Sequence, residues 1–156
     1  MKVKDIMNAS PRSCRPQTNL AEVATLMWDG DCGVIPVVED GNRAIGMVTD
    51  RDICIAVATR RRRADEIQVR ELCGGELFSC RPEDEVLSAL HSMGEHKVRR
   101  LPVLNQSGEL VGVLSLNDII LEAKEKRDRR TGAPTYEEVL NALKSICGHR
   151  LVAVAA

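Results

Sequence analysis

Two short stretches decide how this sequence is organised: GMVTDRDI at residues 46–53 and GVLSLNDI at residues 112–119. Each begins with a glycine, carries a hydroxyl residue three positions later, and ends in aspartate and isoleucine. An apolar run followed by a hydroxyl residue, with an acid three positions on, is typical of a strand that turns into a capped helix. The sequence therefore makes the same predicted turn twice, 66 positions apart.

The match extends well beyond these turns and needs no gap. Identical or similar residues coincide over about fifty positions at this one offset, which indicates an internal duplication. The other matching segments are VKDIM at 3–7 with VRELC at 69–73, SCRP at 13–16 with SCRP at 79–82, and PV at 36–37 with PV at 102–103.

Each repeat has a readable order of strand, helix, strand, strand and helix, so we expect an α+β fold. Two apolar runs on either side of Asp40-Gly41, and again of Ser107-Gly108, predict a hairpin-like strand pair in each copy. Apolar residues spaced for one helical face predict the first helix of each repeat. They are Leu20, Val23, Ala24 and Met27 in the first copy, and Val86, Ala89, Leu90 and Met93 in the second.

The chain divides into a first repeat with its linker (1–66), a second repeat (67–126) and a tail (127–156). We expect the repeats to pack together, because a unit of about 60 residues buries too little surface alone. In the tail, Thr135 and Glu138 form the pattern of a helix cap. The apolar stripe of the helix that would follow is Val139, Leu140, Leu143 and Ile146.

Composition narrows the classes of function. The 156 residues carry a formal net charge of −1 and only 2% aromatic residues, so we expect no nucleic-acid or membrane partner. The charged N-terminus does not resemble a signal peptide, which predicts a cytoplasmic protein. No nucleophile elbow, P-loop or pair of catalytic carboxylates is present, so we expect no enzyme activity. The basic run at 60–63 is diluted by Asp65 and Glu66 and is interpreted as a solvated helix end.

The six cysteines form no Cys-x-x-Cys pair, and we interpret them as reduced, small hydrophobic residues. His91 and His96 are five positions apart and so do not share a helix face as paired zinc ligands do. Zinc held by these residues with Cys73 and Cys80 is possible but not expected. A redox or metal sensor built on cysteines such as Cys14 stays as an alternative.

The repeated turn itself supports two interpretations. In the simpler one, Thr49 with Asp52, and Ser115 with Asp118, only cap the helices that follow. In the other, the positive end of the helix attracts a phosphate, and the carboxylate accepts hydrogen bonds from vicinal ribose hydroxyls. The second builds on the first and predicts a clamp for a nucleoside.

The duplication, the IPVV and LPVL strands and the two turns together resemble a tandem pair of CBS domains, a Bateman module, over roughly residues 1–125. The VKDIM start is similar to stand-alone bacterial members. The resemblance implies pseudo-two-fold symmetry and two clefts for an adenosine ligand: AMP, ADP, ATP, S-adenosylmethionine or NAD. It implies no required cofactor. The ligand-binding residues it implies are Thr49, Asp52, Ser115 and Asp118 for ribose or phosphate, and Ile35, Pro36, Leu101 and Pro102 for adenine.

The two copies differ in the charge of the residues just before the IPV and LPV strands. Arg99 and Arg100 precede the second LPV, whereas Gly33 and Val34 precede the first IPV. Guanidinium groups match phosphate oxygens, so Arg99 and Arg100, with Arg51 in the first turn, complete the predicted ligand set. The alternative for the arginine pair is a solvated edge strand. We expect clefts that are not equivalent.

The sequence as a whole predicts a non-catalytic sensor of adenosine nucleotides. The resemblance implies a homodimer formed through helices, and the response would pass to a separate effector protein. An interaction protein with empty clefts, in which the turns act only as helix caps, is the first alternative.

Overall fold

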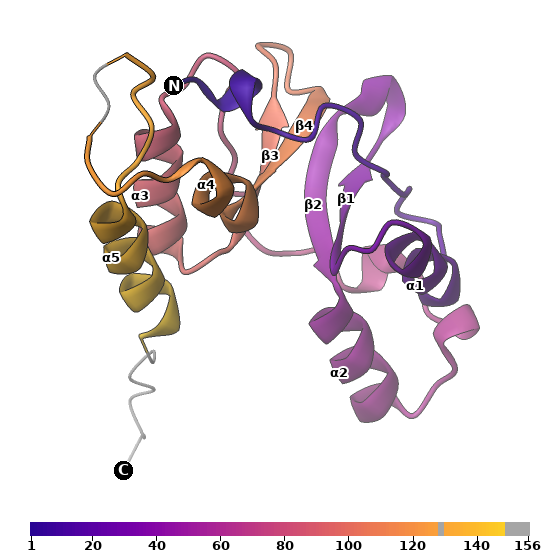
Figure 1. The fold of residues 1–156 in the computed structure, drawn as a ribbon. Helices are drawn as coiled ribbons and strands as arrows, with labels where there is room; N and C mark the ends of the chain where they lie inside the picture. The colour runs from indigo at the N-terminus through magenta and orange to yellow at the C-terminus, as the bar shows by residue number, and fades with distance from the viewer. Residues whose placement is uncertain (128–129, 149–156) are drawn as a thin grey trace.

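The computed structural model describes residues 1–127 and 130–148, and two similar halves lie side by side in it (Figure 1). Each element of the second half begins 66 positions after its counterpart in the first, which confirms the duplication. The first half holds α1 (Leu20–Asp29), β1 (Val34–Val38), β2 (Ala44–Thr49) and α2 (Asp50–Arg60). The second holds α3 (Val86–His96), β3 (Arg100–Leu104), β4 (Leu110–Ser115) and α4 (Leu116–Glu122), and α5 (Tyr136–Cys147) follows.

Each half contains one antiparallel strand pair, β1 with β2 and β3 with β4. The expected leading strand is reduced to a single parallel bridge, formed by Cys14 with Val37 and by its counterpart Cys80 with Val103. In the first repeat the chain turns away directly afterwards, since the Thr18 N–H bonds the Arg15 carbonyl at 3.0 Å. The proline inside this turn has no N–H with which to continue a ladder.

The helices of the two repeats bury the predicted stripes with one exception. Leu20, Val23 and Met27 of α1 are buried, but Ala24 is exposed. All four predicted residues of α3 are buried. The second helix is shorter in the second half, because α4 ends at Glu122 whereas α2 extends to Arg60.

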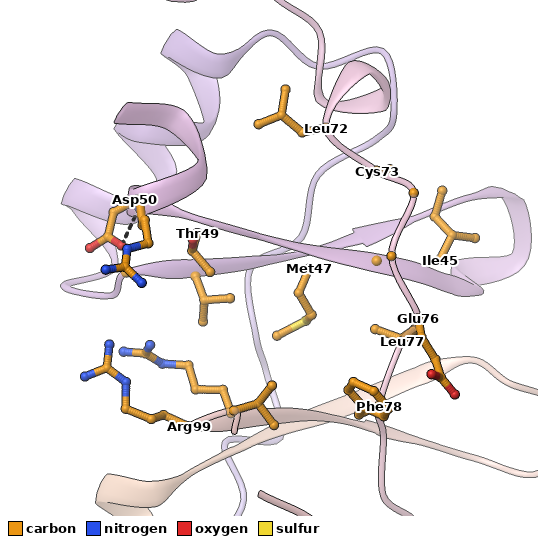
Figure 2. A pocket seen from close by; sticks show the side chains of 18 of the residues that line it. Ile45, Met47, Thr49, Asp50, Leu72, Cys73, Glu76, Leu77, Phe78 and Arg99 are labelled. Atoms are coloured by element: carbon orange, nitrogen blue, oxygen red, sulfur yellow. Dashed lines mark hydrogen bonds between the residues drawn. The ribbon is translucent and has the colours of Figure 1, made fainter. Parts of the chain in front are cut away.

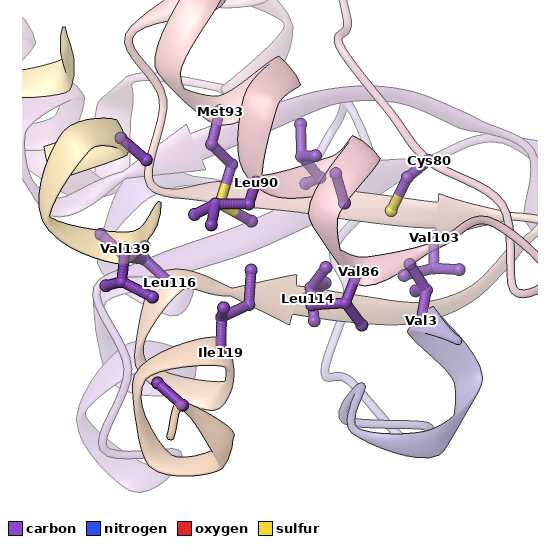
Figure 3. Close-up of a cluster of buried hydrophobic side chains, with 14 residues drawn as sticks. Val3, Cys80, Val86, Leu90, Met93, Val103, Leu114, Leu116, Ile119 and Val139 are labelled. Atoms are coloured by element: carbon purple, nitrogen blue, oxygen red, sulfur yellow. The ribbon is translucent and has the colours of Figure 1, made fainter. Parts of the chain in front are cut away.

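The short segment in front of each repeat packs into the other repeat. Val3 is fully buried in the core of the second repeat, beside Val86 and Leu114 (Figure 3). Val69, its counterpart 66 positions later, is fully buried in the core of the first. The backbone N–H groups of Val3 and Val69 bond the carbonyls of Asp84 and Thr18, each at 2.9 Å. The repeats are consecutive along the chain, but their packed cores exchange these segments.

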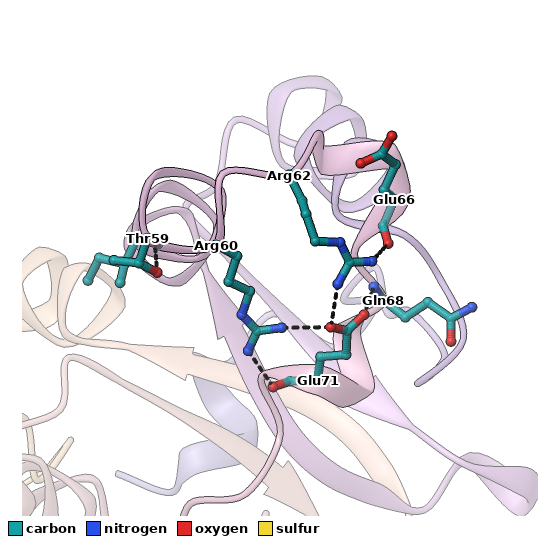
Figure 4. Close-up of polar contacts among 7 residues, drawn as sticks. Thr59, Arg60, Arg62, Glu66, Gln68 and Glu71 are labelled. Carbon is teal, nitrogen blue, oxygen red and sulfur yellow. Dashed lines mark hydrogen bonds and ion pairs between the residues drawn. The ribbon is translucent and has the colours of Figure 1, made fainter.

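The arginine-rich end of α2 holds the exchanged segment against the first repeat (Figure 4). The Glu71 carboxylate accepts from Arg60 at 2.7 Å and from Arg62 at 2.9 Å. The backbone N–H of Gln68, and then these guanidinium groups, lower the pKa of Glu71. The ion pairs therefore stabilise the fold above the ordinary carboxyl pKa and lose this effect as the pH falls through the lowered value.

The two strand pairs meet through a small apolar cluster and through their turns. Val38 from the first repeat packs with Leu110 and Val113 from the second. The Asn42 side-chain amide donates to the Leu110 carbonyl at 2.7 Å, and the Ala44 N–H donates to the Gly108 carbonyl at 3.2 Å. Gly108 has a φ of +81°, a conformation that glycine adopts without strain.

Helix α5 begins with the predicted cap, in which the Thr135 hydroxyl accepts from the Glu138 N–H. It lies along α3 (Figure 1) and buries Val139 and Ala142. The predicted stripe was wrong at Leu140, which is 50% exposed, because the buried face is turned toward Ala142. A small residue on α3 permits the contact: a Cβ atom at Gly94 would lie only 3.5 Å from the Ser145 Cβ.

Gly94→Leu should therefore displace α5, whereas Gly94→Ala should not. The alanine Cβ meets Ser145 at an ordinary van der Waals distance and favours the helix, but the leucine side chain has no room. Overpacking of this kind costs about 1–3 kcal/mol of unfolding free energy. Thermal unfolding and limited proteolysis within residues 136–147 measure the effect. Equal stability and equal cleavage of the two variants would show that the α3–α5 contact is loose.

Candidate functional site: two clefts between the repeats

The repeated turns form reciprocal helix caps. At the first turn, the Asp52 Oδ2 accepts from the Thr49 N–H at 2.9 Å and from the Thr49 hydroxyl at 2.7 Å. At the second, the Asp118 Oδ2 accepts from the Ser115 N–H at 2.8 Å and from its hydroxyl at 2.7 Å. The capping prediction is confirmed. Within the described residues no hydrogen bond occupies the Oδ1 atom of either aspartate, so one oxygen of each carboxylate stays available.

The first cleft lies between the first turn and the start of β3 and has a volume of about 570 Å³. Figure 2 shows Met47 and Thr49 on one side of it and Arg99 and Phe78 on the other. Residues 72–78, which link the exchanged segment to the second repeat, close one edge. This volume lies within the range of about 300–1,000 Å³ that is usual for small-molecule sites.

The second cleft is smaller, about 310 Å³, and lies beside the second turn. Ser115 and Asp118 line it together with Ile35 and Pro36. Asn8 narrows the second cleft, because its backbone exchanges two hydrogen bonds of 3.0 Å with Val113. No such bridge forms at the corresponding place in the first cleft among the residues that the structure describes.

Each cleft combines one repeat's turn with the other repeat's strand. Arg99 and Arg100 meet Thr49 and Arg51 of the other repeat in the first cleft. Ile35 and Pro36 likewise meet Ser115 and Asp118 in the second. Three of the predicted residues line neither cleft: Asp52, which is bonded to Thr49, and the buried Leu101 and Pro102.

The sequence reasoning missed the two segments that close the clefts. Residues 74–78 border the first cleft, and several residues within 8–12 border the second. They occupy equivalent positions, but GGELF and NASPR share no residue type, so the repeat comparison gave no sign of them. Met47 also lines the first cleft and was not predicted, although its position just before the first turn could have indicated this.

The two clefts differ in charge. Arg51, Arg99 and Arg100 line the first, with Asp50 and Glu76 as the acidic residues. Lys97 also lines it, but its amine donates to the Gly148 carbonyl at 2.7 Å.

The second cleft has Asp31 and Asp118 against Arg12 and Arg100. The Arg12 guanidinium lies 3.8 Å from Asp29 and donates to the Leu26 carbonyl. The first cleft therefore attracts anions more strongly.

The cysteines do not offer reactive thiolates in the cores. Burial raises the pKa of the Cys14 and Cys80 thiols to about 12. Burial, and then the nearby Asp52 carboxylate, raise the pKa of Cys73. His96 stacks on Phe78 with the ring centroids 3.7 Å apart. In residues 1–127 and 130–148, no three His, Cys, Asp or Glu side chains gather closely enough to hold a metal ion.

The helices in the described part of the chain are too short or too polar to cross a bilayer.

Comparisons with known proteins agree with the duplication. A family model of the CBS domain matches residues 3–59 and again residues 69–125. The CBS domain-containing protein YhcV of Bacillus subtilis (strain 168) is 38% identical over 117 residues, which is 75% of this chain and 81% of that protein.

Solved structures of similar fold include proteins with bound ligands. CBS domain protein PAE2072 from Pyrobaculum aerophilum, complexed with AMP, is 28% identical with a TM-score of 0.71, over 78% of this chain and 92% of that one. Hypoxic Response Protein I, with two coordinated zinc ions, is 30% identical with a TM-score of 0.71, over 78% of this chain and 98% of that one.

The cysteine environments predict an order of alkylation. Treatment of the folded protein with iodoacetamide at pH 8 should modify the exposed Cys54 and Cys147 first, since Cys14 and Cys80 are buried with raised pKa values. We expect the buried pair to react at least about tenfold more slowly, because the thiolate is the reactive form. Mass spectrometry of peptides measures the order, and the unfolded protein is the control. Fast modification of Cys14 or Cys80 would favour a cysteine-based sensor.

Proposed function

The chain belongs to the CBS domain family and carries the domain twice in tandem, and on this basis we propose that it is a regulatory module that binds adenosine nucleotides. It has no catalytic activity in this proposal. The observation that carries the proposal is the first cleft, where a capped helix start, a hydroxyl group and guanidinium groups without a partner among the described residues face a cavity of about 570 Å³. The AMP complex of a relative of the same fold supports an adenosine ligand.

The first cleft offers suitable groups for each part of a nucleotide: the phosphate, the ribose and the base. The N-terminus of α2, a helix of eleven residues, adds a positive dipole beside Arg51 and Arg99, which suits phosphate oxygens. Thr49 lines the cleft and is the group that we assign to a ribose hydroxyl. Asp52 does not line the cleft, and in this proposal it acts by holding the Thr49 hydroxyl in place. Adenine would contact apolar side chains of the cleft wall: Ile45, Met47, Leu72 and Val98.

Signalling would follow from a difference in affinity between two arrangements of the repeats. Both clefts join the two repeats, so a ligand that fits one arrangement better stabilises it. We propose a cytoplasmic homodimer that transmits this change to an effector protein. Trp28 on α1 is 87% exposed and Ile55 on α2 is 53% exposed, and such apolar helix surfaces support pairing through helices.

Two alternative functions differ from this proposal in what they require of the clefts and the cysteines. An interaction module with empty clefts would use Thr49–Asp52 and Ser115–Asp118 only as helix caps. A cysteine-based redox or metal sensor has less support, because the buried thiols of Cys14 and Cys80 are held in the protonated form.

Thermal unfolding with AMP, ADP, ATP, S-adenosylmethionine, NAD and GTP tests the proposal. An adenosine ligand at a hundred times its dissociation constant should raise the unfolding free energy by about 2.7 kcal/mol. Asp52→Ala or Asp118→Ala should abolish the increase from whichever cleft is occupied. GTP should have a weaker effect than the adenosine ligand that binds best.

Loss of a cap must be separated from loss of a binding group. Glu138→Ala removes the same kind of cap from α5, outside both clefts, and should lower stability by about 1 kcal/mol like the aspartate variants. It should keep the full ligand response. If no ligand stabilises the parent protein while all three variants lose stability, the turns are caps only.

A further inference from the structure

One arginine lies where the two clefts meet. Arg100 and its counterpart Val34, 66 positions earlier, line the first cleft and also the second. Equivalent residues that share both sites must lie close to the pseudo-two-fold axis between the repeats. The axis therefore has an aliphatic side chain from one repeat and a guanidinium group from the other.

The guanidinium group of Arg100 is available to a ligand. Within residues 1–127 and 130–148 it makes no ion pair and no hydrogen bond to a protein group, and its residue is only partly exposed. Its neighbour Arg99 lines the first cleft but not the second. Arg12, the other basic residue of the second cleft, is already engaged by Asp29 and the Leu26 carbonyl.

We propose that Arg100 is a single phosphate-binding group shared by the two clefts, so that a phosphate-bearing ligand in one cleft lowers the affinity of the other for a second such ligand. The proposal rests on the nucleotide-binding function proposed above. A guanidinium group drawn to a phosphate on one side is no longer free to neutralise a phosphate on the other. Two anions near one axis also repel each other, most strongly where water is excluded.

The first cleft should take the phosphate-bearing ligand. It is the larger, it has Arg51 and Arg99 in addition, and α2 is four residues longer than α4. With Arg100 engaged there, Asp31 and Asp118 are left facing the second cleft with Arg12, which is paired. The second cleft of the nucleotide-bound protein should then prefer an adenosine ligand without phosphate, such as adenosine itself.

Calorimetric titration with ADP measures the coupling when one cleft is closed. Met47→Trp fills the first cleft, because Met47 points into it (Figure 2). ADP should bind the second cleft of this variant about tenfold more tightly than it binds as the second ligand of the parent protein, a ratio typical of coupled sites. Circular dichroism and thermal unfolding confirm that the variant is folded.

Two substitutions copied from the first repeat identify the residue responsible. Arg100→Val installs the counterpart Val34. The same ratio is then measured between the Arg100→Val variant and the Arg100→Val/Met47→Trp double variant, and it should fall from about tenfold to about one. Arg99→Gly installs the counterpart Gly33 and is the matched control. It should weaken the first ADP event but leave the ratio unchanged. Adenosine titrated into the ADP-saturated parent should bind with the affinity it has for the Met47→Trp variant.

The results that overturn the proposal are distinct from failure of the proposed function. Two independent ADP events in the parent protein, a ratio unchanged by Arg100→Val, or no ADP binding to the Met47→Trp variant would each refute sharing by Arg100. In all three cases a nucleotide would still bind the parent. Absence of binding by ADP and by every other adenosine ligand would instead refute the proposed function, and the shared site with it.

Discussion

The exchange of two short segments is the constraint on which the rest of the structure depends. Val3 completes the core of the second repeat and Val69 that of the first, each fully buried and each held by a backbone hydrogen bond. Neither repeat has a complete core without a residue from outside its own helices and strands. Since the chain must cross between the repeats next to each exchanged segment, the two candidate clefts form along these crossings, and both contain residues from the two halves.

The capped turns serve folding and the proposed binding with the same few atoms. In both turns a single carboxylate oxygen holds the hydroxyl and the backbone N–H, which fixes the helix start and leaves the second oxygen without a partner in the part of the chain that the structure describes. A rigid acceptor costs little ordering when a ligand arrives. The cap and the nucleoside clamp are therefore compatible roles of one arrangement.

The duplication is most informative at the positions where its copies differ. Gly94 lets α5 lie against α3, whereas its counterpart Trp28 is exposed on α1, so within residues 1–127 and 130–148 one of the two equivalent helix surfaces is covered and the other is not. Arg100 stands where the first repeat has Val34, which places one charge at the axis of an otherwise symmetrical pair. Symmetry in the backbone and asymmetry in a few side chains together make two similar clefts chemically different.

The sequence by itself determined the duplication, the order of elements, both capped turns and the capped C-terminal helix, because these depend on local periodicity and on residues three or four positions apart. It also singled out Arg99, Arg100 and Thr49 by their chemistry. Only the tertiary structure decided that these three meet at the first cleft, that Leu101 and Pro102 are buried away from both clefts, and that residues 74–78 close the first. The physical reason is that each cleft forms between segments from different repeats, and contacts over that separation leave no periodic trace in a single sequence.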